Sequence, residues 1–151
     1  MSNAKKYKIG YTQGTYDLFH IGHLNLLEHA KEQCEQLIVG LNSDELVMKY
    51  KNRKVNIPEQ DRARIVEAIK VVDKVMIVET LDKKVAWNKI HFNAIFIGDD
   101  WKGNDRWKKT EEELSEVNVP VIYLPHTEGI STSKLTQRIK NNNEKRKDSD
   151  A

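Results

Sequence analysis

Two histidines three positions apart are the residues of this sequence whose types and spacing best suit chemistry. His20 and His23 stand at the start of a stretch with apolar residues at helical spacing, and that stretch follows a strand-like run ending near Gly14. Residues three apart lie on one face of a helix, and a helix N-terminus attracts phosphate through its free N–H groups and partial positive charge. The pattern predicts a nucleotide phosphate site, suited to a transfer reaction catalysed by positioning and charge stabilisation.

Two other interpretations of the histidines are open. Each could be a structural residue satisfied within the fold, although a pair directly after a glycine turn is harder to explain in that way. A zinc site would need further ligands. Asp17 offers one, but the single cysteine, Cys34, falls in the body of the expected helix and suits core packing. We therefore expect no metal site held by the protein alone.

Three motifs resemble those of the cytidylyltransferases, within the nucleotidyltransferase superfamily that also contains the class I aminoacyl-tRNA synthetases. The run GTYDLFHIGH at residues 14–23 is similar to the family's GTFD and HxGH, HTEGISTSK at residues 126–134 is similar to RTEGIST, and GDDW at residues 98–101 also matches. The HxGH motif is shared across the superfamily, whereas its combination with TEGIST is specific for the cytidylyl branch. From about residue 8 to residue 140 the chain resembles the bacterial glycerol-3-phosphate cytidylyltransferases.

The resemblance implies a reaction in which the phosphate of a small acceptor, glycerol 3-phosphate, attacks the α-phosphorus of CTP. Pyrophosphate leaves, Mg²⁺ enters with CTP, and the product is CDP-glycerol for cell-envelope, teichoic acid or capsule polymers. By the same resemblance, His20, His23 and Asp17 are expected to be catalytic, and Lys51 and Lys84 to bind the acceptor. The residues expected to bind the nucleotide are Gly14, Thr15, Tyr16, Gly22, Arg53, Asp100, His126, Thr127, Gly129, Ile130, Ser131, Thr132 and Ser133.

The residue types suit these roles, and several have a plainer alternative. A carboxylate such as Asp100 accepts a hydrogen bond from the cytosine amino group, a donor that uracil lacks, whereas Trp101 suits packing. Thr15 can donate to phosphate or serve only the turn. Asp17 can orient a base or a metal ion, or cap the following helix. The hydroxyls of residues 131–133 can cap the last helix, which is compatible with a phosphate site at the same helix end.

A basic run and two departures from the family pattern need interpretation. Residues 49–54 are either a solvated face or a mobile basic lid over the site. His126 stands where the family usually has arginine, so a permanent bidentate phosphate binder is replaced by a mostly neutral ring. We expect weaker or more pH-dependent nucleotide binding, or a different acceptor. Lys70 stands where arginine is frequent in the family, which keeps the charge but loses the planar fork of donors.

Apolar, β-branched runs alternate with helical patterns along the chain. Strands are expected at residues 9–12, 36–41, 74–78, 94–97 and 119–124, and helices at 21–34, 43–48, 58–70, 83–91, 110–116 and 131–140. This alternation predicts an α/β fold, a Rossmann-like doubly wound parallel sheet, and the resemblance adds the strand order 3-2-1-4-5. Thr15 and residues 98–101 and 125–132 each follow an expected strand, so we expect the motifs to meet at one edge of the sheet.

Length and composition limit the class of protein. The 151 residues carry a net charge of +2 and suit one domain, over residues 5–140, followed by a polar tail at 141–151 that we expect to fray. The nearly balanced charge does not support nucleic-acid binding, one cysteine precludes an internal disulfide, and no apolar run approaches the length of a membrane span. We expect a cytoplasmic protein with no membrane partner, and the resemblance implies a homodimer.

Three other functions are open at this point. Transfer to choline phosphate or ethanolamine phosphate would need acidic or aromatic residues around the acceptor's cation, and the sequence identifies no such cage. A nucleotide-binding module without catalytic activity has only His126 in its support. A fragment of an aminoacyl-tRNA synthetase is suggested by HIGH at residues 20–23, but the chain offers no room for an anticodon-binding domain and no extended basic surface.

Overall fold

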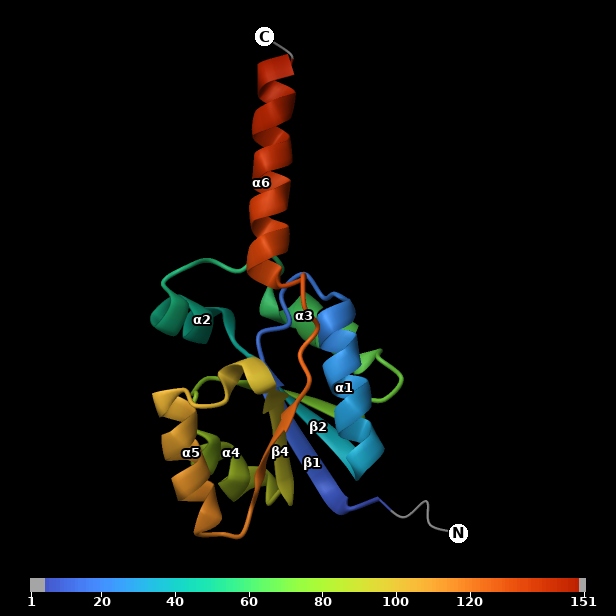
Figure 1. The fold of residues 1–151 in the computed structure, drawn as a ribbon, viewed down its shortest axis with the longest axis vertical. Helices are drawn as coiled ribbons and strands as arrows, with labels where there is room; N and C mark the ends of the chain where they lie inside the picture. Colours follow the sequence, from blue (N-terminus) through green and yellow to red (C-terminus); the bar gives the residue numbers. More distant parts are fainter. Residues whose placement is uncertain (1–4, 150–151) are drawn as a thin grey trace.

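A single five-stranded parallel sheet organises the protein. The structure is a computed structural model that describes the backbone of residues 5–149 and the side chains of residues 5–145. The strands are β1 (Tyr7–Gly14), β2 (Cys34–Asn42), β3 (Lys74–Val78), β4 (Ala94–Gly98) and β5 (Val121–Leu124). They are arranged in the order β3-β2-β1-β4-β5, and every pair is parallel (Figure 1). The predicted α/β fold and strand order are confirmed.

Helices cover both faces of this sheet (Figure 1). Within the described residues they are α1 (Ile21–Gln33), α2 (Asp44–Lys51), α3 (Glu59–Glu67), α4 (Lys83–Ile90), the short 3-10 helix η1 (Asp99–Trp101), α5 (Asp105–Ser115) and α6 (Thr132–Ser149). Side chains of α1 and α3 form one buried cluster with the sheet, and side chains of α4 and α5 form the other. None of these helices is both long enough and apolar enough to cross a membrane.

Successive side chains of a strand point to opposite faces of the sheet, so each central strand contributes to both layers of the core. In β2, Leu37, Val39 and Leu41 pack on the side of α1 and α3, whereas Ile38 points to the side of α4 and α5. A strand buried on both faces reads as a continuous apolar run rather than an alternating one. The run at residues 37–41 therefore identifies a central strand.

Two helices differ from their predicted bounds by about five residues or more, whereas α2 ends at Lys51 and α3 at Glu67, close to the predicted 48 and 70. The helix expected at residues 110–116 begins at Asp105, because the side chain of Asn104 caps it by accepting from the backbone N–H of Arg106 and of Trp107. The last helix runs past residue 140 to Ser149, so residues 141–149, expected to fray, are helical, and residues 150–151 lie outside the described part of the chain. Helix-favouring lysine, arginine and glutamate side chains allow this extension without an apolar face.

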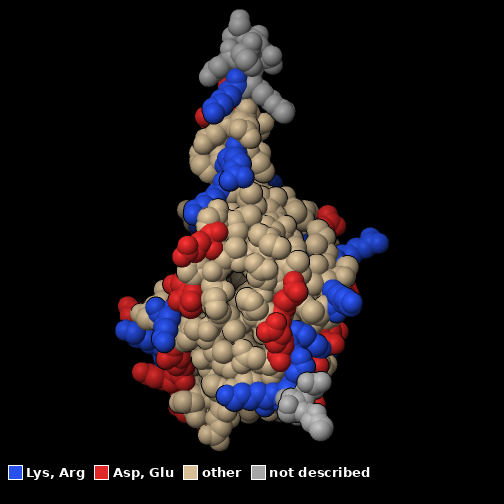
Figure 2. All heavy atoms as spheres, turned by 45° about the vertical axis from the view of Figure 1, so that its right-hand side comes forward, with Lys and Arg blue, Asp and Glu red and all other residues tan. Residues whose placement is uncertain are grey.

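The extended α6 projects away from the sheet (Figure 1). Its residues after Thr136 are exposed as far as their side chains are described. On the face drawn in Figure 2, basic side chains lie along this projection, while acidic and basic side chains alternate around the body below it.

Arg62 of α3 ties together the carboxyl ends of two central strands. Its guanidinium is 1% exposed and donates from Nη1 to the carbonyl oxygens of Thr15 (2.7 Å) and Asn42 (2.9 Å). Nε donates to the carbonyl oxygen of Ile57 at 2.7 Å, and Nη2 donates to the carboxylate of Asp44. Carbonyl groups at the ends of strands lose their ladder partners and need donors from elsewhere. One side chain thus fixes the turn after β1, the start of α2 and the loop before α3.

We predict that Arg62→Met lowers the free energy of unfolding by about 3 kcal/mol, because it leaves buried carbonyl groups and a carboxylate without their donors. Urea unfolding measures this loss. Arg64→Met is the matched control, since Arg64 lies on the same helix and is exposed, and we expect a change below about 0.5 kcal/mol. Equal losses in the two variants would contradict the role given to Arg62.

Candidate active site

Two adjoining cavities open at the carboxyl ends of the parallel strands, where ligands bind in folds of this kind. The first cavity, of ≈ 190 Å³, is lined by residues from β1, α2, α4 and α5, and the second, of ≈ 310 Å³, lies between the starts of α1 and α6 and η1. The residues common to both linings are Gln13, Gly14, Thr15, Tyr16, His23, Lys51, Arg53, Ile97, Trp101 and Thr132. The two cavities therefore form one continuous site with a shared wall.

Most residues nominated by the motifs lie on these walls. They are Gly14, Thr15, Tyr16, Asp17, His20, Gly22, His23, Lys51, Arg53, Asp100, His126, Thr127, Ile130, Ser131, Thr132 and Ser133. Gly129 lies outside both linings, and its φ of 81° places it in the left-handed region that favours glycine. The three motifs meet at one edge of the sheet, as their positions after strands predict.

The two histidines cap α1 and face the second cavity. His20 is the N-cap, and its Nδ1 accepts from the backbone N–H of Gly22 at 3.0 Å, while Nδ1 of His23 accepts from the backbone N–H of His20 at 3.2 Å. The rings stack with centroids 3.8 Å apart. Because each Nδ1 accepts a hydrogen bond, each neutral ring carries its proton on Nε2. The reciprocal cap therefore fixes both Nε2–H groups as donors for a ligand.

Both imidazoles are neutral near pH 7. Burial lowers the pKa of His20 below its ordinary value, and burial together with the neighbouring His20 lowers the pKa of His23 to about 3. Lys51 also lowers the pKa of His23, while Asp17 opposes the shift. The histidines thus act as uncharged hydrogen-bond donors, and the positive potential of the site comes from helix ends and from lysine and arginine.

Gly22, between the two histidines, is required because a side chain there would clash with a neighbouring ring, and not because of its backbone angles. A Cβ on Gly22 would lie 2.8 Å from Cε1 of the His20 ring. Any side chain at this position would displace the ring that caps the helix. The H-x-G-H spacing therefore describes a packing requirement of the cap itself.

The carboxylate of Asp17 fixes the loop between α2 and α3. Its carboxylate is buried, with Oδ2 accepting from the backbone N–H (2.8 Å) and the side-chain amide (3.0 Å) of Asn56, and Oδ1 accepting from the N–H of Ile57 at 2.9 Å. The cap of α1 is His20, so the capping alternative for Asp17 is wrong. Both carboxylate oxygens are engaged by the loop between α2 and α3, and Asp17 also lines the first cavity, so its role in orienting a base or a metal ion stays a prediction. The backbone carbonyl of Asp17 accepts from the Thr132 hydroxyl, which joins the turn before α1 to the start of α6.

The start of α6 is both capped and open to the second cavity. The Ser131 hydroxyl accepts from the backbone N–H of Lys134 at 3.1 Å, which is the capping role that the sequence allowed. Nη1 of Arg53 lies 3.4 Å from the Ser133 hydroxyl and connects the basic loop to this helix end. A polyanion between α1 and α6 would therefore meet two helix N-termini and the arginine of the loop.

His126, the departure from the family's arginine, is paired with Asp99. Its Nδ1 lies 2.5 Å from Oδ1 of Asp99, and this hydrogen bond raises the pKa of His126 and lowers that of Asp99. The ring keeps its positive charge to a higher pH than an ordinary histidine, which partly replaces the charge of arginine. Asp99, Asp100 and His126 bring potential ligand atoms within 4.8 Å of one another, but a protonated His126 has no lone pair for a metal ion, so only the two carboxylates would suit a hard divalent cation such as Mg²⁺.

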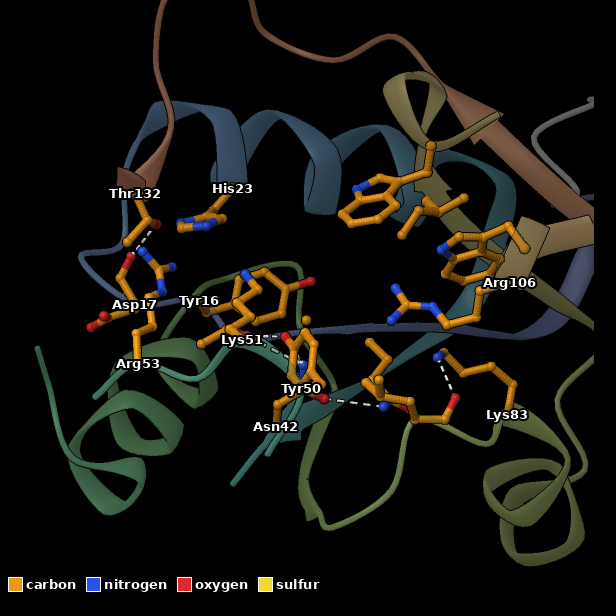
Figure 3. A pocket seen from close by; sticks show the side chains of 17 residues that line it. Tyr16, Asp17, His23, Asn42, Tyr50, Lys51, Arg53, Lys83, Arg106 and Thr132 are labelled. Atoms are coloured by element: carbon orange, nitrogen blue, oxygen red, sulfur yellow. Dashed lines mark hydrogen bonds between the residues drawn. The ribbon is translucent and has the colours of Figure 1, made fainter. Parts of the chain in front are cut away.

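Of the two lysines at the start of α4, Lys83 lines a cavity and Lys84, the expected one, does not. Lys84 lies outside the linings of both cavities, with Nζ 3.9 Å from a carboxylate oxygen of Glu116, so the structure does not bring it to the site with the other expected residues. Lys83 lines the first cavity instead, together with Arg106 (Figure 3). The residues that sequence reasoning missed on this side are Gln13, Asn42, Tyr50, Lys83 and Arg106. Only Lys83 had a signal in the sequence, namely its position next to Lys84, the lysine expected to bind the acceptor.

Solved structures of other proteins share the fold of this chain. The lipopolysaccharide core biosynthesis protein of Thermoplasma volcanium superposes with a TM-score of 0.67 over 80% of this chain and 97% of its own, at 18% identity. Pantothenate synthetase of Thermus thermophilus gives a TM-score of 0.54 over 80% of this chain and 56% of its own, at 17% identity. These matches support the α/β fold of the chain.

Sequence relatives define the family. Residues 11–138 match the model described as cytidylyltransferase-like. The glycerol-3-phosphate cytidylyltransferase of Bacillus spizizenii is 41% identical over 82% of this chain and 91% of its own, and that of Bacillus subtilis is 37% identical over 85% and 94%. The FAD synthase of Thermococcus kodakarensis is 35% identical over 83% and 87%. The chain is therefore a nucleotidyltransferase, and it belongs to the cytidylyltransferase-like family.

We predict that His20→Ala and His23→Ala each lower turnover about a hundredfold or more, because each removes a donor aimed at developing phosphate charge. Steady-state release of pyrophosphate, with melting curves for each variant, measures this. Glu28→Ala, on the exposed side of α1, is the control and should keep full turnover. Nearly normal turnover in a folded His23 variant would remove the histidines from the reaction.

Acid should destabilise the fold through His23. Its pKa is about 3 in the folded protein against an ordinary 6.5, so the unfolded state binds more protons below about pH 6.5 and stability falls as the pH decreases. We predict that His23→Gln, whose amide can keep the reciprocal cap, reduces the loss of unfolding free energy between about pH 7 and about pH 5 by about 2 kcal/mol. Urea unfolding at both pH values checks this, and an unchanged pH dependence would contradict it.

Proposed function

We propose that the chain transfers CMP from CTP to glycerol 3-phosphate, giving CDP-glycerol and pyrophosphate for the synthesis of cell-envelope or capsule polymers. The observation that carries the proposal is the convergence of the histidine-capped start of α1 and the hydroxyl-rich start of α6 on one cavity. Its family and its bacterial relatives support the same chemistry. The acceptor phosphate attacks the α-phosphorus, and no protein nucleophile is required.

Binding of the triphosphate relies on donors that are in place before the nucleotide arrives. Both Nε2–H groups of His20 and His23 are oriented by the cap, and Ser131, Thr132 and Ser133 bring hydroxyls and backbone N–H groups to the start of α6. Arg53 lies on the wall common to both cavities and adds a planar fork of donors for the leaving pyrophosphate. Mg²⁺ entering with the nucleotide would neutralise part of the phosphate charge.

Recognition of the base is assigned to the second cavity, around η1. Asp100 lines that cavity beside Gly98, and a Cβ on Gly98 would lie 2.6 Å from Oδ1 of Asp100. The glycine therefore leaves room for the carboxylate. An ionised carboxylate accepts from the amino group of cytosine and repels the carbonyl oxygen that uracil carries at the same place. This chemistry supports CTP over UTP as the donor.

The lining of the first cavity favours an anionic acceptor. Lys51, Lys83 and Arg106 contribute positive charge, and the acidic residue of the lining, Asp17, has both carboxylate oxygens engaged by the loop. Choline phosphate and ethanolamine phosphate would place their own cation among these groups, at an electrostatic cost. A small phosphorylated alcohol without a cation fits better.

Adenylyl transfer to flavin mononucleotide is the second candidate function. FAD synthases of two Thermococcus species are 34–35% identical over 83% of this chain, and the rings of Tyr50 and Trp101 line the first cavity. The glycerol-3-phosphate cytidylyltransferases are 37% and 41% identical to this chain, which keeps glycerol 3-phosphate the first candidate.

A panel of donors and acceptors tests the proposal. We expect pyrophosphate release to be highest with CTP and glycerol 3-phosphate, among CTP, ATP, GTP and UTP combined with glycerol 3-phosphate, choline phosphate, ethanolamine phosphate and flavin mononucleotide. Highest release with ATP and flavin mononucleotide would establish the second candidate. Calorimetric binding of CTP without release for any acceptor would favour a non-catalytic module. The homodimer and the cytoplasmic location stay predictions.

A further inference from the structure

A chain of buried hydroxyl and amide groups runs from the middle of the sheet toward the first cavity. The hydroxyl of Tyr11, which is 0% exposed, donates to Oε1 of Gln13 at 2.6 Å. Nε2 of Gln13 donates to Oδ1 of Asn42 and to the backbone carbonyl oxygen of Thr80, both at 3.0 Å. The fold leaves room for this chain, because a Cβ on Gly40 would overlap the Tyr11 hydroxyl.

The directions of these hydrogen bonds are fixed by the carbonyl group of Thr80. A carbonyl oxygen only accepts, so the nitrogen of the Gln13 amide must face Thr80 and its oxygen must face Tyr11. Burial, and after it the neighbouring Tyr16, raise the pKa of Tyr11, so its hydroxyl keeps the proton that it donates. The second N–H of Gln13 then requires the oxygen of the Asn42 amide, which turns the nitrogen of that amide toward the cavity.

Two hydroxyl groups end the chain and share one hydrogen bond. Nδ2 of Asn42 donates to Oγ1 of Thr15 at 3.3 Å and to the hydroxyl oxygen of Tyr50 at 3.2 Å (Figure 3). The two hydroxyl oxygens lie 3.1 Å apart, so one of them donates to the other. Among the described residues neither hydroxyl has a further protein partner. One O–H group is therefore left to donate to a ligand.

The remaining donor is the hydroxyl of Thr15. A phenol is more acidic than an aliphatic alcohol and is the stronger donor, so Tyr50 donates and Thr15 accepts. Oγ1 of Thr15 then accepts from Asn42 and from Tyr50, which occupies both lone pairs and fixes the direction of its own O–H. Hydrogen bonds arranged head to tail also strengthen one another. The chain thus turns Thr15 into a donor with a set direction.

The place and polarity of this donor indicate its ligand. Thr15 lines both cavities, whereas Tyr50 lines the first alone, so the O–H belongs to the wall that the cavities share. Because both lone pairs of the Thr15 hydroxyl are occupied, it cannot accept from a ligand, and its partner must supply an acceptor atom. An oxygen of a phosphate group is such an acceptor, and a charged acceptor makes the stronger hydrogen bond.

We propose that Asn42 and Tyr50 are positioning residues that orient the Thr15 hydroxyl toward an oxygen of the phosphate undergoing transfer. The inference rests on the proposed nucleotidyl transfer and adds residues that act through Thr15. No proton leaves the hydroxyl, since its role is to stabilise charge on the phosphate oxygen. The ring of Tyr50 has other contacts, 5.5 Å from Nζ of Lys51 and 5.9 Å from the guanidinium of Arg106, and Tyr50→Phe keeps that ring while removing the hydroxyl.

A double-mutant cycle between Tyr50 and Thr15 tests the proposal. We expect Thr15→Val to lower kcat/KM for CTP about tenfold and Tyr50→Phe to lower it about fivefold, because a charge-assisted donor is lost or released from its direction. The two together should cost no more than Thr15→Val alone, about tenfold, whereas independent roles would multiply to about fiftyfold. Paired with Thr15→Ser, which keeps a hydroxyl, Tyr50→Phe should again cost about fivefold.

Binding provides a readout without turnover. Affinity for a CTP analogue with a methylene group between the α- and β-phosphorus atoms, measured by calorimetry, should show the same lack of additivity. Tyr123→Phe is the matched control, because it removes a phenol hydroxyl that donates to Glu111 outside both cavities, and kcat/KM should stay within about twofold. Melting curves establish that each variant is folded, and Thr15→Ala replaces Thr15→Val in the cycle if the valine variant does not fold.

Multiplicative losses would overturn the proposal, because Tyr50 would then act independently of Thr15. Unchanged kinetics in Tyr50→Phe would overturn it as well, as would failure of the unaltered protein to bind the analogue. Failure of the proposed function has a different signature. In that case no donor and acceptor pair releases pyrophosphate, while the calorimetric cycle still reports whether the two hydroxyls act on a bound phosphate as one unit.

Discussion

The buried guanidinium of Arg62 sets the geometry on which the site depends. The strands β1 and β2 end side by side, and the carbonyl groups of Thr15 and Asn42 point past the last ladder hydrogen bonds. A lysine could supply a charge there, but the planar fork of arginine can serve several acceptors in different directions. Through Ile57 and Asp44 the same group fixes the loop before α3 and the start of α2. The turn that carries the first motif and the helix that carries Lys51 are therefore held by one side chain.

The loop between α2 and α3 is fixed a second time, by Asp17. Its carboxylate accepts from Asn56 and Ile57, and the side chain of Asn56 also donates to the Thr136 hydroxyl on α6. The basic run at residues 49–54, which could be a solvated face or a mobile lid, is thus followed by a segment anchored next to the start of α6. Its first residues, up to Lys51, belong to α2, so only residues 52–55 lie between the helix and the anchor.

Local signals explain what the sequence predicts correctly, and tertiary docking explains the rest. The start of α1 is predictable because the cap, the glycine and the apolar spacing lie within a few residues. The sequence does not indicate which of Lys83 and Lys84 lines a cavity. Neighbours on a helix point about 100° apart, and only the packing of α4 against the sheet decides which one enters the cavity. Asp17 gains its partners from a distant loop, and an arginine in a helix, such as Arg62, is expected to be exposed rather than buried.

The two cavities differ in the kind of positive potential that they offer, and the difference matches the two substrates. The second cavity offers neutral donors, namely imidazoles, hydroxyls and helix N–H groups, beside Lys51 and Arg53 on the wall that both cavities share. A nucleoside triphosphate brings its own divalent cation, so directed hydrogen bonds suffice to orient it. The first cavity holds full charges on Lys51, Lys83 and Arg106. A phosphate monoester carries no such cation, and it must approach a second anion before it can react. Coulomb repulsion between the two substrates is largest at that moment, and side-chain cations on the acceptor's side are the groups able to offset it.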